Sequence, residues 1–525
     1  MLAFRHSSRG TSVTQRRRVA VLVTALILAA AFVAGLSPGT AAAQVATPAI
    51  PWDVNGDGYA DIGVAAITED LNAIGNAGIF HLLPGGAGGV TGTGSKAYTQ
   101  DTAGVPDVAQ SGDQFGYAQA SGDFNADGFA DVAVSANSED LSTVADSGQV
   151  HVFFGSAAGL RTDNSRTFSL NGTAYGARKN AFFGDSLAAG DFNGDGRDDL
   201  AIGASGFGRV FWVRGSSSGL GSQLIAFNQD SAGVPGVHKY NDLFGFSLSA
   251  GDVNADGRDD LAVGAPWDWD DRDWSTGAVT VLYGSGTGLT GSGSQRWSKD
   301  SSGIAGIPGN FTTDWSDSFG IQVALADYNG DGYADLGTSA PGTPIVVSGV
   351  KRQDAGTVHL IYGSATKLNS TGNRQLTQAT SGVPGTVETG DLFGMTIAGG
   401  DADGDGQAEL AAFAAGDETV IEIPGDNRFN PITSALAWTQ NSTGVAGSTE
   451  FGDSFGASLR FALFRGGNQA GLAIGIPGED GGEGAVEVLY GSGSGLTASG
   501  SDYFTQDTAG VPDVAQSGDW FGTFY

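Results

Sequence analysis

Short hydrophobic runs alternate with glycine-rich turns along most of the chain. Runs such as DVAVSA (131–136) and DLAVGA (260–265) are followed by QVHVFFGS (149–156) and AVTVLYGS (278–285). Short runs rich in valine, leucine and aromatic residues, bounded by glycine and aspartate, are typical of strands. The pattern predicts an all-β fold.

The pattern also repeats, with four strands to a unit. Each unit has a run that starts at Phe-Gly, then two hydrophobic runs, then a shorter polar run such as AYTQD (97–101) or YFTQD (503–507). The seven Phe-Gly pairs that stand in register begin at Phe115, Phe183, Phe244, Phe319, Phe393, Phe455 and Phe521. Four-stranded antiparallel units repeated in this way form a propeller or a linear array.

The two ends of the chain favour a closed ring. The first loop, at Asp53, has no Phe-Gly before it, whereas Phe521 has no loop after it, and TQDTAGVPDVAQSGD occurs both at 99–113 and at 505–519. The ends therefore complement each other as one repeat, and we expect a seven-bladed β-propeller of four-stranded antiparallel blades, which leaves no open sheet edge. WFGTFY (520–525) would be the innermost strand of the first blade, although residues 46–51 could fill the same place. A truncated duplication with a free tail is the alternative.

Six nine-residue loops carry the candidate chemistry. Each has oxygen-bearing side chains at positions 1, 3, 5 and 9 and glycine at position 6, and the backbone carbonyl of position 7 can add another oxygen. Oxygen-only donor sets rich in carboxylates suit Ca²⁺. β-patterned runs flank the loops, which disfavours an EF-hand. The seventh copy has Arg465 and Asn468 where carboxylates are expected, so blade seven should fold without metal.

We therefore predict up to six Ca²⁺ sites. Their ligands would be Asp53, Asn55, Asp57, Tyr59 and Asp61; Asp123, Asn125, Asp127, Phe129 and Asp131; Asp191, Asn193, Asp195, Arg197 and Asp199; Asp252, Asn254, Asp256, Arg258 and Asp260; Asp327, Asn329, Asp331, Tyr333 and Asp335; and Asp401, Asp403, Asp405, Gln407 and Glu409.

These features resemble the FG-GAP repeats of integrin α-subunit heads and their bacterial relatives. Gly-Ala-Pro is literal at Gly264-Ala265-Pro266, and the resemblance covers residues 50–525. It implies a seven-bladed propeller with calcium loops on one face, the loop side chains at positions 1, 3, 5 and 9 being the metal ligands. Gly-Ala-Pro is degraded in several repeats, and six loops are more than integrin heads typically keep. Adhesion carries over only as an analogy of fold.

Charge and the first residues bear on location. The net charge is −32 and there is no cysteine, so the acidity disfavours nucleic acid and anionic membranes as partners. Five arginines precede an apolar run (19–36) that ends in Ala41-Ala42-Ala43, which indicates a secretory signal over 1–43, with a single propeller over 44–525. The alternative is an uncleaved anchor; Sec and twin-arginine export both stay open. We expect a monomeric protein, secreted or at the cell surface, without stable membrane insertion after cleavage.

One loop is a candidate ligand contact. PWDWDDRDWSTG (266–277) contains Trp267, Trp269 and Trp274 and should lie on the face opposite the calcium loops, where exposed aromatics suit sugars or cationic groups. The alternative is packing onto neighbouring blades. We expect a binding or adhesion module for an extracellular protein or polysaccharide, without enzymatic activity. A secreted hydrolase, glycosidase-like or esterase-like, is the rival, but no nucleophile motif supports it. Three histidines (His81, His151 and His359) occupy matching strand positions, which favours a packing role.

Overall fold

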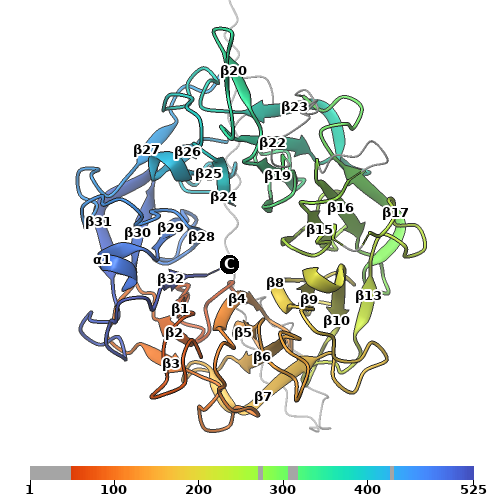
Figure 1. The fold of residues 1–525 in the computed structure, drawn as a ribbon, viewed down its shortest axis with the longest axis vertical. Coiled ribbons are helices and arrows are strands. Elements are labelled where there is room, and N and C mark those ends of the chain that lie inside the picture. Colours follow the sequence, from red (N-terminus) through yellow and green to blue (C-terminus); the bar gives the residue numbers. More distant parts are fainter. Residues whose placement is uncertain (1–48, 240, 270–275, 306–316, 426–430, 525) are drawn as a thin grey trace, which may run out of the picture. The chain divides into compact units, whose positions relative to one another are not determined.

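The computed structural model describes residues 49–239, 241–269, 276–305, 317–425 and 431–524. Residues 46–525 form one compact unit. The proposed signal segment and Trp274 lie outside the described residues. Seven four-stranded antiparallel sheets are arranged around a central axis, which confirms the seven-bladed β-propeller (Figure 1).

Each blade runs from an innermost strand beside the central axis to an outermost strand at the rim. In that order, blade 1 is β32 (Phe521–Thr523), β1 (Ile62–Ala66), β2 (Ile79–Leu83) and β3 (Lys96–Tyr98). Blade 2 is β4 (Phe115–Gly122), β5 (Asp131–Ala136), β6 (Gln149–Phe154) and β7 (Arg161–Ser169). Blade 3 is β8 (Phe183–Gly190), β9 (Asp199–Ala204), β10 (Arg209–Val213) and β13 (Ile225–Phe227). Blade 4 is β14 (Leu248–Gly251), β15 (Asp260–Ala265), β16 (Ala278–Tyr283) and β17 (Thr290–Trp297).

The remaining blades follow the same order. Blade 5 is β18 (Val323–Ala326), β19 (Asp335–Ala340), β22 (Thr357–Tyr362) and β23 (Asn369–Leu376). Blade 6 is β24 (Phe393–Gly400), β25 (Glu409–Ala414), β26 (Thr419–Ile423) and β27 (Leu436–Trp438). Blade 7 is β28 (Ser458–Ala462), β29 (Gly471–Ile476), β30 (Ala485–Ser492) and β31 (Gly495–Phe504).

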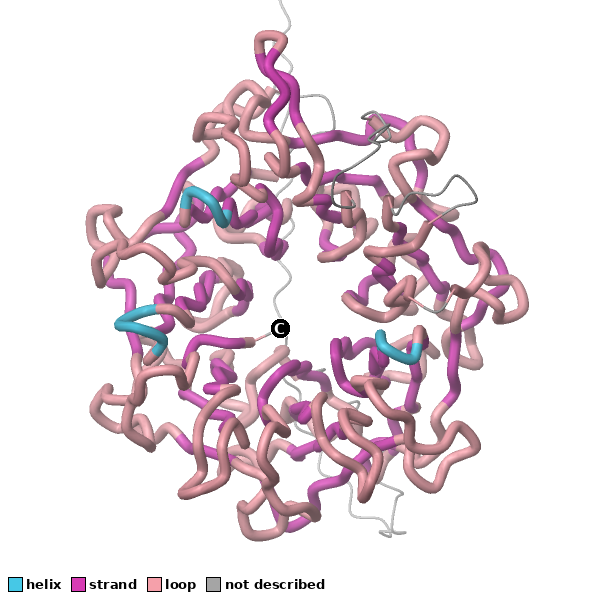
Figure 2. The backbone as a smooth tube through the Cα atoms, in the orientation of Figure 1, coloured by secondary structure: helices cyan, strands magenta, loops and turns pink. Residues whose placement is uncertain are grey.

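Little structure lies outside the blades, as the backbone trace in Figure 2 shows. The extra elements are the hairpins β11 (Gly215–Ser216) with β12 (Gly219–Leu220) and β20 (Ile345–Val347) with β21 (Val350–Arg352), and the helical turns η1 (Ser205–Phe207), η2 (Ala415–Asp417) and α1 (Glu479–Gly482). The β20–β21 hairpin extends outward from the ring of blades at the top of Figure 1.

The Phe-Gly pairs recur because both residues are fixed by packing between blades. All seven phenylalanines are fully buried. The glycine that follows has a positive φ in every case; at Gly116, for example, φ is 108°. A Cβ on Gly116 would lie 2.4 Å from the Cβ of Ala65 in the neighbouring blade. Only glycine fits such a close approach in the left-handed region.

The ring closes through the last strand. β32 pairs antiparallel with β1, with Ala65 opposite Thr523, so the C-terminal segment is the innermost strand of blade 1, as expected. Arg460 of blade 7 supports the closure because its guanidinium stacks on Trp52 (4.1 Å to the ring centroid) and Phe524 (5.0 Å). The chain that leaves blade 7 thus ends as a strand of blade 1, and cation–π contacts of Arg460 join the two blades.

Candidate metal centre

Each of the six predicted loops leads into the second strand of its blade. In blades 2 to 6 the loop connects the first strand to the second, whereas in blade 1 the first strand, β32, comes from the C-terminal segment. Each loop is organised around its first aspartate, whose carboxylate accepts backbone N–H groups from the turn. In the first loop, Asp53 Oδ1 accepts the N–H of Gly56 (2.8 Å), and Oδ2 accepts the N–H of Gly58 (2.8 Å). The same bonds recur at Asp191 and Asp327. The local sequence therefore orders the loop and directs the position 1 carboxylate into it.

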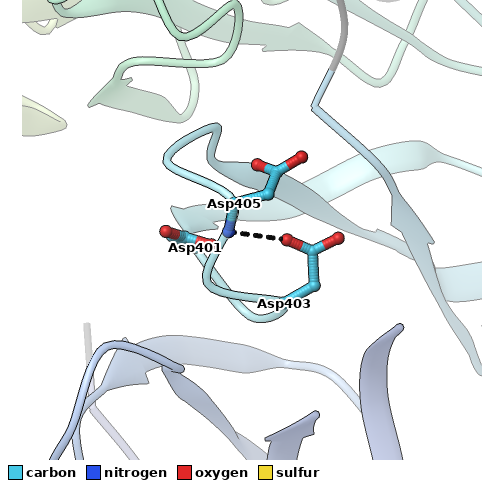
Figure 3. Close-up of side chains that lie close together, drawn as sticks. All are labelled: Asp401, Asp403 and Asp405. Carbon is cyan, nitrogen blue, oxygen red and sulfur yellow. Dashed lines mark hydrogen bonds between the residues drawn. The ribbon is translucent and has the colours of Figure 1, made fainter. Parts of the chain in front are cut away.

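The sixth loop brings three carboxylates together (Figure 3). One oxygen each of Asp401, Asp403 and Asp405 lies within 4.8 Å of the others. Asp403 Oδ1 accepts the backbone N–H of Asp405 (3.0 Å). Three negative charges at this distance repel one another, and a hard divalent cation would relieve the repulsion. The donor set therefore fits Ca²⁺.

The other five loops carry asparagine at position 3. In four of them its Nδ2 donates to the position 9 carboxylate, as Asn329 does to Asp335 (2.6 Å) and Asn193 to Asp199 (2.9 Å). In the second loop Asn125 Oδ1 is buried and has no hydrogen-bond partner. An unpartnered buried amide oxygen at a predicted ligand position is what a cation site would leave in the absence of its ion.

The position 9 carboxylates are the buried members of the set. In the second loop, Asp131 Oδ1 accepts the N–H of Gly155 (2.9 Å) and Oδ2 that of Phe124 (3.1 Å). Burial, reinforced by nearby loop carboxylates, raises the pKa of Asp131 to about 8. The same cause raises the pKa of the other position 9 groups, to about 6 for Asp199 and about 7 for Asp61, Asp260, Asp335 and Glu409. These groups favour a nearby positive charge, from either a proton or a metal ion.

The loops also join neighbouring blades. The N–H of position 8 donates to the position 1 carbonyl of the preceding loop, as Ala130 does to Asp53 (3.0 Å). Equivalent bonds of 2.8–3.1 Å link all seven blades, and Ala60 completes the circle by donating to Leu463 in the seventh copy. We call this ring of seven bonds the loop belt. It places all six candidate sites on one face of the propeller.

Two arginines contact a predicted ligand in the third loop. Arg214 donates to Asp195 Oδ2 (2.7 Å) and to Asn193 Oδ1 (3.2 Å), and Arg197 lies 3.5 Å from Asp195 Oδ1. These contacts compete with a cation for the same oxygens. Sequence reasoning missed Arg214, although it stands where the fourth, fifth and seventh blades have tyrosine before the glycine.

In the seventh copy, the predicted non-ligands make other contacts. The Arg465 guanidinium stacks on Tyr490 (3.3 Å to the centroid) and donates to the carbonyl of Gly500 (2.7 Å). Asn468 Nδ2 donates to the carbonyl of Gly404 in the sixth loop (3.1 Å). Arginine and amide groups thus take part in the packing of this loop.

Trp267 and Trp269 follow β15, in the connection to β16. Their side chains are 50% and 42% exposed, so neither is packed fully into a blade. The Lys239 ammonium, in the linker before blade 4, lies 4.9 Å from the ring centroid of Trp269. The loop therefore meets the blade-to-blade linker and presents its tryptophans partly to solvent.

The three strand histidines are packing residues, as expected. His81, His151 and His359 are fully buried, and each lies against the phenylalanine of its own Phe-Gly pair, with ring centroids 5.3–5.4 Å apart. Burial lowers the pKa of each to about 3, so they are neutral at physiological pH.

Comparison with known proteins supports the repeat assignment. The family model described as FG-GAP repeat matches residues 115–153, 183–221, 244–282 and 319–361. Each match starts at a Phe-Gly pair and spans one of the nine-residue loops. The four matches correspond to blades 2 to 5.

Curated relatives include both integrins and phospholipases. Integrin alpha-PS5 of Drosophila melanogaster is 40% identical over 164 residues, covering 30% of this chain and 15% of that protein. Integrin alpha-7 of Homo sapiens is 33% identical over 184 residues, covering 34% and 14%. Phosphatidylinositol-glycan-specific phospholipase D of Rattus norvegicus is 32% identical over 169 residues, covering 30% and 18%. The chain thus spans less than a fifth of the length of these three relatives.

Solved structures are only distantly similar. The rhamnogalacturonan lyase YesW has a TM-score of 0.36 and 12% identity, covering 85% of this chain and 71% of that one. The Dos1 propeller has a TM-score of 0.32 and 13% identity, covering 69% and 63%. Within the described residues, no helix has the length and apolar character needed to cross a membrane.

Proposed function

We propose, from the premise that this chain is an integrin-like FG-GAP propeller, that it is a calcium-stabilised extracellular binding module. The observation that carries the proposal is the division between its two faces. One face carries the six acidic loops of the loop belt, and the opposite face carries exposed apolar side chains. The module would use the second face to hold a protein or polysaccharide ligand.

Calcium has a structural role in this proposal. Each loop leads into the second strand of its blade, and the loop belt links each loop to the next. An ion bound at positions 1, 3, 5, 7 and 9 would therefore stabilise a blade together with its contact to a neighbour. Since the unfolded chain has no preformed sites, binding would add directly to the free energy of unfolding.

The opposite face offers the contact surface. Linkers and the connections between second and third strands lie there, and they contain partly exposed apolar residues. These residues include Val108, Val237, Trp267, Trp269, Phe451, Val514 and Trp520, exposed by 42% to 106%. Large apolar side chains rimmed by polar groups are typical of interaction sites, and aromatic rings stack well on sugars.

Binding can be tested with the double variant Trp267→Ala/Trp269→Ala. Immobilised polysaccharides and extracellular matrix proteins would be screened with purified protein in calcium and in EGTA. We expect calcium-dependent retention by at least one ligand, reduced about tenfold or more in the double variant. Leu436→Ser is the control, because Leu436 is 39% exposed on β27, the outermost strand of blade 6, at the rim of the propeller.

Two outcomes would contradict the proposal. Retention that is unchanged in the double variant would remove the tryptophans from the site. Release of products from a glycan or phospholipid would favour the hydrolase alternative, to which the phospholipase D relatives give some weight. Both integrins and phospholipases match the chain, so turnover has to be measured directly in the same screen.

Export is the remaining part of the proposal. The arginines and apolar run before Ala43 support a cleaved signal, and integrin α relatives are cell-surface proteins. The N-terminus of the protein recovered outside the cell, determined by mass spectrometry, should begin close to residue 44. An intact Met1 on the exported protein would contradict cleavage.

A further inference from the structure

A second set of buried acids lies where neighbouring blades meet on the face opposite the loop belt. We call each of these places a seam. In the seam between blades 1 and 2, Glu139 of blade 2 accepts Gln100 Nε2 (2.7 Å) and Gln110 Nε2 (3.0 Å) from the preceding chain. Asp113 accepts the backbone N–H of Gln110 (2.6 Å). Two amide groups therefore donate hydrogen bonds to one glutamate.

The seam between blades 7 and 1 is built in the same way. Glu69 accepts Gln506 Nε2 (2.9 Å) and Gln516 Nε2 (3.3 Å). Gln506 and Gln516 occupy the same places in TQDTAGVPDVAQSGD (505–519) as Gln100 and Gln110 do in its first copy. The duplicated segment thus provides the same pair of amide donors to the next blade on each occasion.

The seam between blades 6 and 7 departs from this pattern at one residue. Glu450 stands where the other two seams have Gln110 and Gln516, and its backbone N–H makes the matching bond to Asp453 (2.5 Å). An ionised carboxylate cannot donate to the blade 7 acid, Glu479, whose second donor is the Tyr503 hydroxyl (3.0 Å). Instead, one oxygen each of Glu450, Asp453 and Glu479 lies within 4.8 Å of the others.

Other seams offset their acids with basic side chains. Lys299 Nζ lies 3.0 Å from Asp317 Oδ2, and Arg296 Nε lies 2.8 Å from Asp268 Oδ2. Across the described parts of the chain, no lysine or arginine forms an ion pair with Glu450, Asp453 or Glu479. Two of these acids are buried, with 2% exposure for Asp453 and 5% for Glu479. Burying carboxylates together without a counter-charge is costly.

A buried amide oxygen also lacks a partner at this seam. Gln440 is 2% exposed, and its Nε2 donates to Glu479 Oε2, so its side-chain amide lies against the acidic group. Its Oε1 accepts no hydrogen bond. The equivalent oxygens of Gln100 and Gln506 are buried and unpartnered too, so this feature is shared by the seams. What distinguishes the blade 6–7 seam is its third carboxylate.

We propose that Glu450, Asp453 and Glu479, with Gln440 Oε1, bind one further divalent cation, Ca²⁺, at the seam between blades 6 and 7. The cation supplies the positive charge that neither the Gln440 amide nor the Tyr503 hydroxyl, the two donors to Glu479, brings to this seam. Calcium accepts six to eight oxygen ligands at about 2.3–2.6 Å in flexible geometry. Three carboxylates and an amide provide part of this set, and water completes it at Glu450, which is exposed.

The test compares Glu450→Gln with a matched control, Glu388→Gln. Two other seams have glutamine, Gln110 and Gln516, at the position equivalent to Glu450, so the variant should fold. Glu388 holds the corresponding place before blade 6, where its backbone N–H donates to Asp391 (2.5 Å). Crystals of all three proteins would be soaked in Tb³⁺ as a calcium probe and measured for anomalous scattering. Calcium bound per chain would be measured in parallel by equilibrium dialysis.

We expect an anomalous peak between Glu450, Asp453 and Glu479 in the wild type and in Glu388→Gln. The peak should be lost in Glu450→Gln, with about one fewer calcium ion bound per chain, while peaks at the nine-residue loops are retained. A wild-type crystal with no peak at the seam overturns the proposal, and so does a peak that persists in Glu450→Gln.

Discussion

Asparagine at position 131 would test whether the position 9 carboxylates are metal ligands or only structural acceptors. Asp131 is fully buried and both oxygens accept backbone N–H groups, so the substitution removes a charge and one acceptor. The two interpretations predict opposite signs for the change in stability that the substitution causes without calcium. A structural carboxylate stabilises the fold whether or not calcium is present, whereas a metal-binding carboxylate destabilises the fold when the ion is absent.

The size of each effect follows from the surroundings of Asp131. Its pKa rises from 3.8 to about 8, so at pH 9 the ionised carboxylate destabilises the calcium-free protein by up to roughly 6 kcal/mol. The lost acceptor costs about 1–3 kcal/mol. We therefore expect Asp131→Asn to stabilise the calcium-free protein by about 3 kcal/mol. With roughly 2 cal/mol/K of unfolding entropy per residue over 46–525, this corresponds to a rise of about 3 °C in Tm.

In calcium, the wild type should be more stable than Asp131→Asn. At about 1,000 times Kd, the wild type gains about 4 kcal/mol from this site, and the variant loses most of that gain. Differential scanning calorimetry at pH 9, in EGTA and in calcium, measures both cases. Asp163→Asn is the control, because Asp163 lies in the same blade with its side chain 71% exposed. If Asp131→Asn lowered Tm by the same amount in both buffers, the carboxylate would be structural only.

Three further predictions concern pH, the third loop and ring closure. Decalcified protein should lose stability as pH rises from 6.5 to 8. The pKa of Asp61 and Asp260 is raised to about 7 and that of Asp131 to about 8, so the folded state holds protons that the unfolded chain has lost. A Tm that rises over this pH range would contradict the prediction. Arg214→Ala should tighten calcium binding at the third loop several-fold in a calcium titration, since Arg214 donates to Asp195. Unchanged or weaker binding would show that the arginine does not compete with calcium for this carboxylate. Phe521→Ala should lower the free energy of unfolding by about 3–5 kcal/mol and speed hydrogen exchange in β1 more than in β15, because Phe521 is fully buried at the ring closure. Trp520→Ala is the control, since Trp520 is exposed. Equal exchange rates in β1 and β15 would count against closure through β32.

The blades could be predicted because their causes are local. Each hydrophobic run, glycine turn and acidic loop is read from neighbouring residues, and repetition corrects errors in any one copy. The inner strand of blade 1 was ambiguous because two segments could pair with the same edge. The register of Ala65 with Thr523 assigns that place to the C-terminal segment.

The contacts between blades could not be derived in the same way. Gln100 and Glu139, or Gln440 and Glu479, are 39 residues apart and meet only after two blades have formed and docked. The sequence contains a trace of them, since Thr-Gln ends several fourth strands and Glu-Asp follows several second strands. Without coordinates, nothing indicates that these two motifs face each other. Arg214 was missed for a related reason, because its effect on Asp195 depends on how its side chain crosses the loop.

The loop belt places a limit on how such a chain can diverge. Because the carbonyl of position 1 and the N–H of position 8 serve different neighbours, a loop shortened or lengthened by one residue would break contacts on both sides of its blade. Ligand side chains are free of that restriction. The seventh copy illustrates the difference: it has replaced its acids, yet Leu463 and Ala470 keep the spacing and both bonds. Substitution within these turns is tolerated, whereas an insertion or deletion would break the hydrogen bonds of the loop belt on both sides of the altered loop.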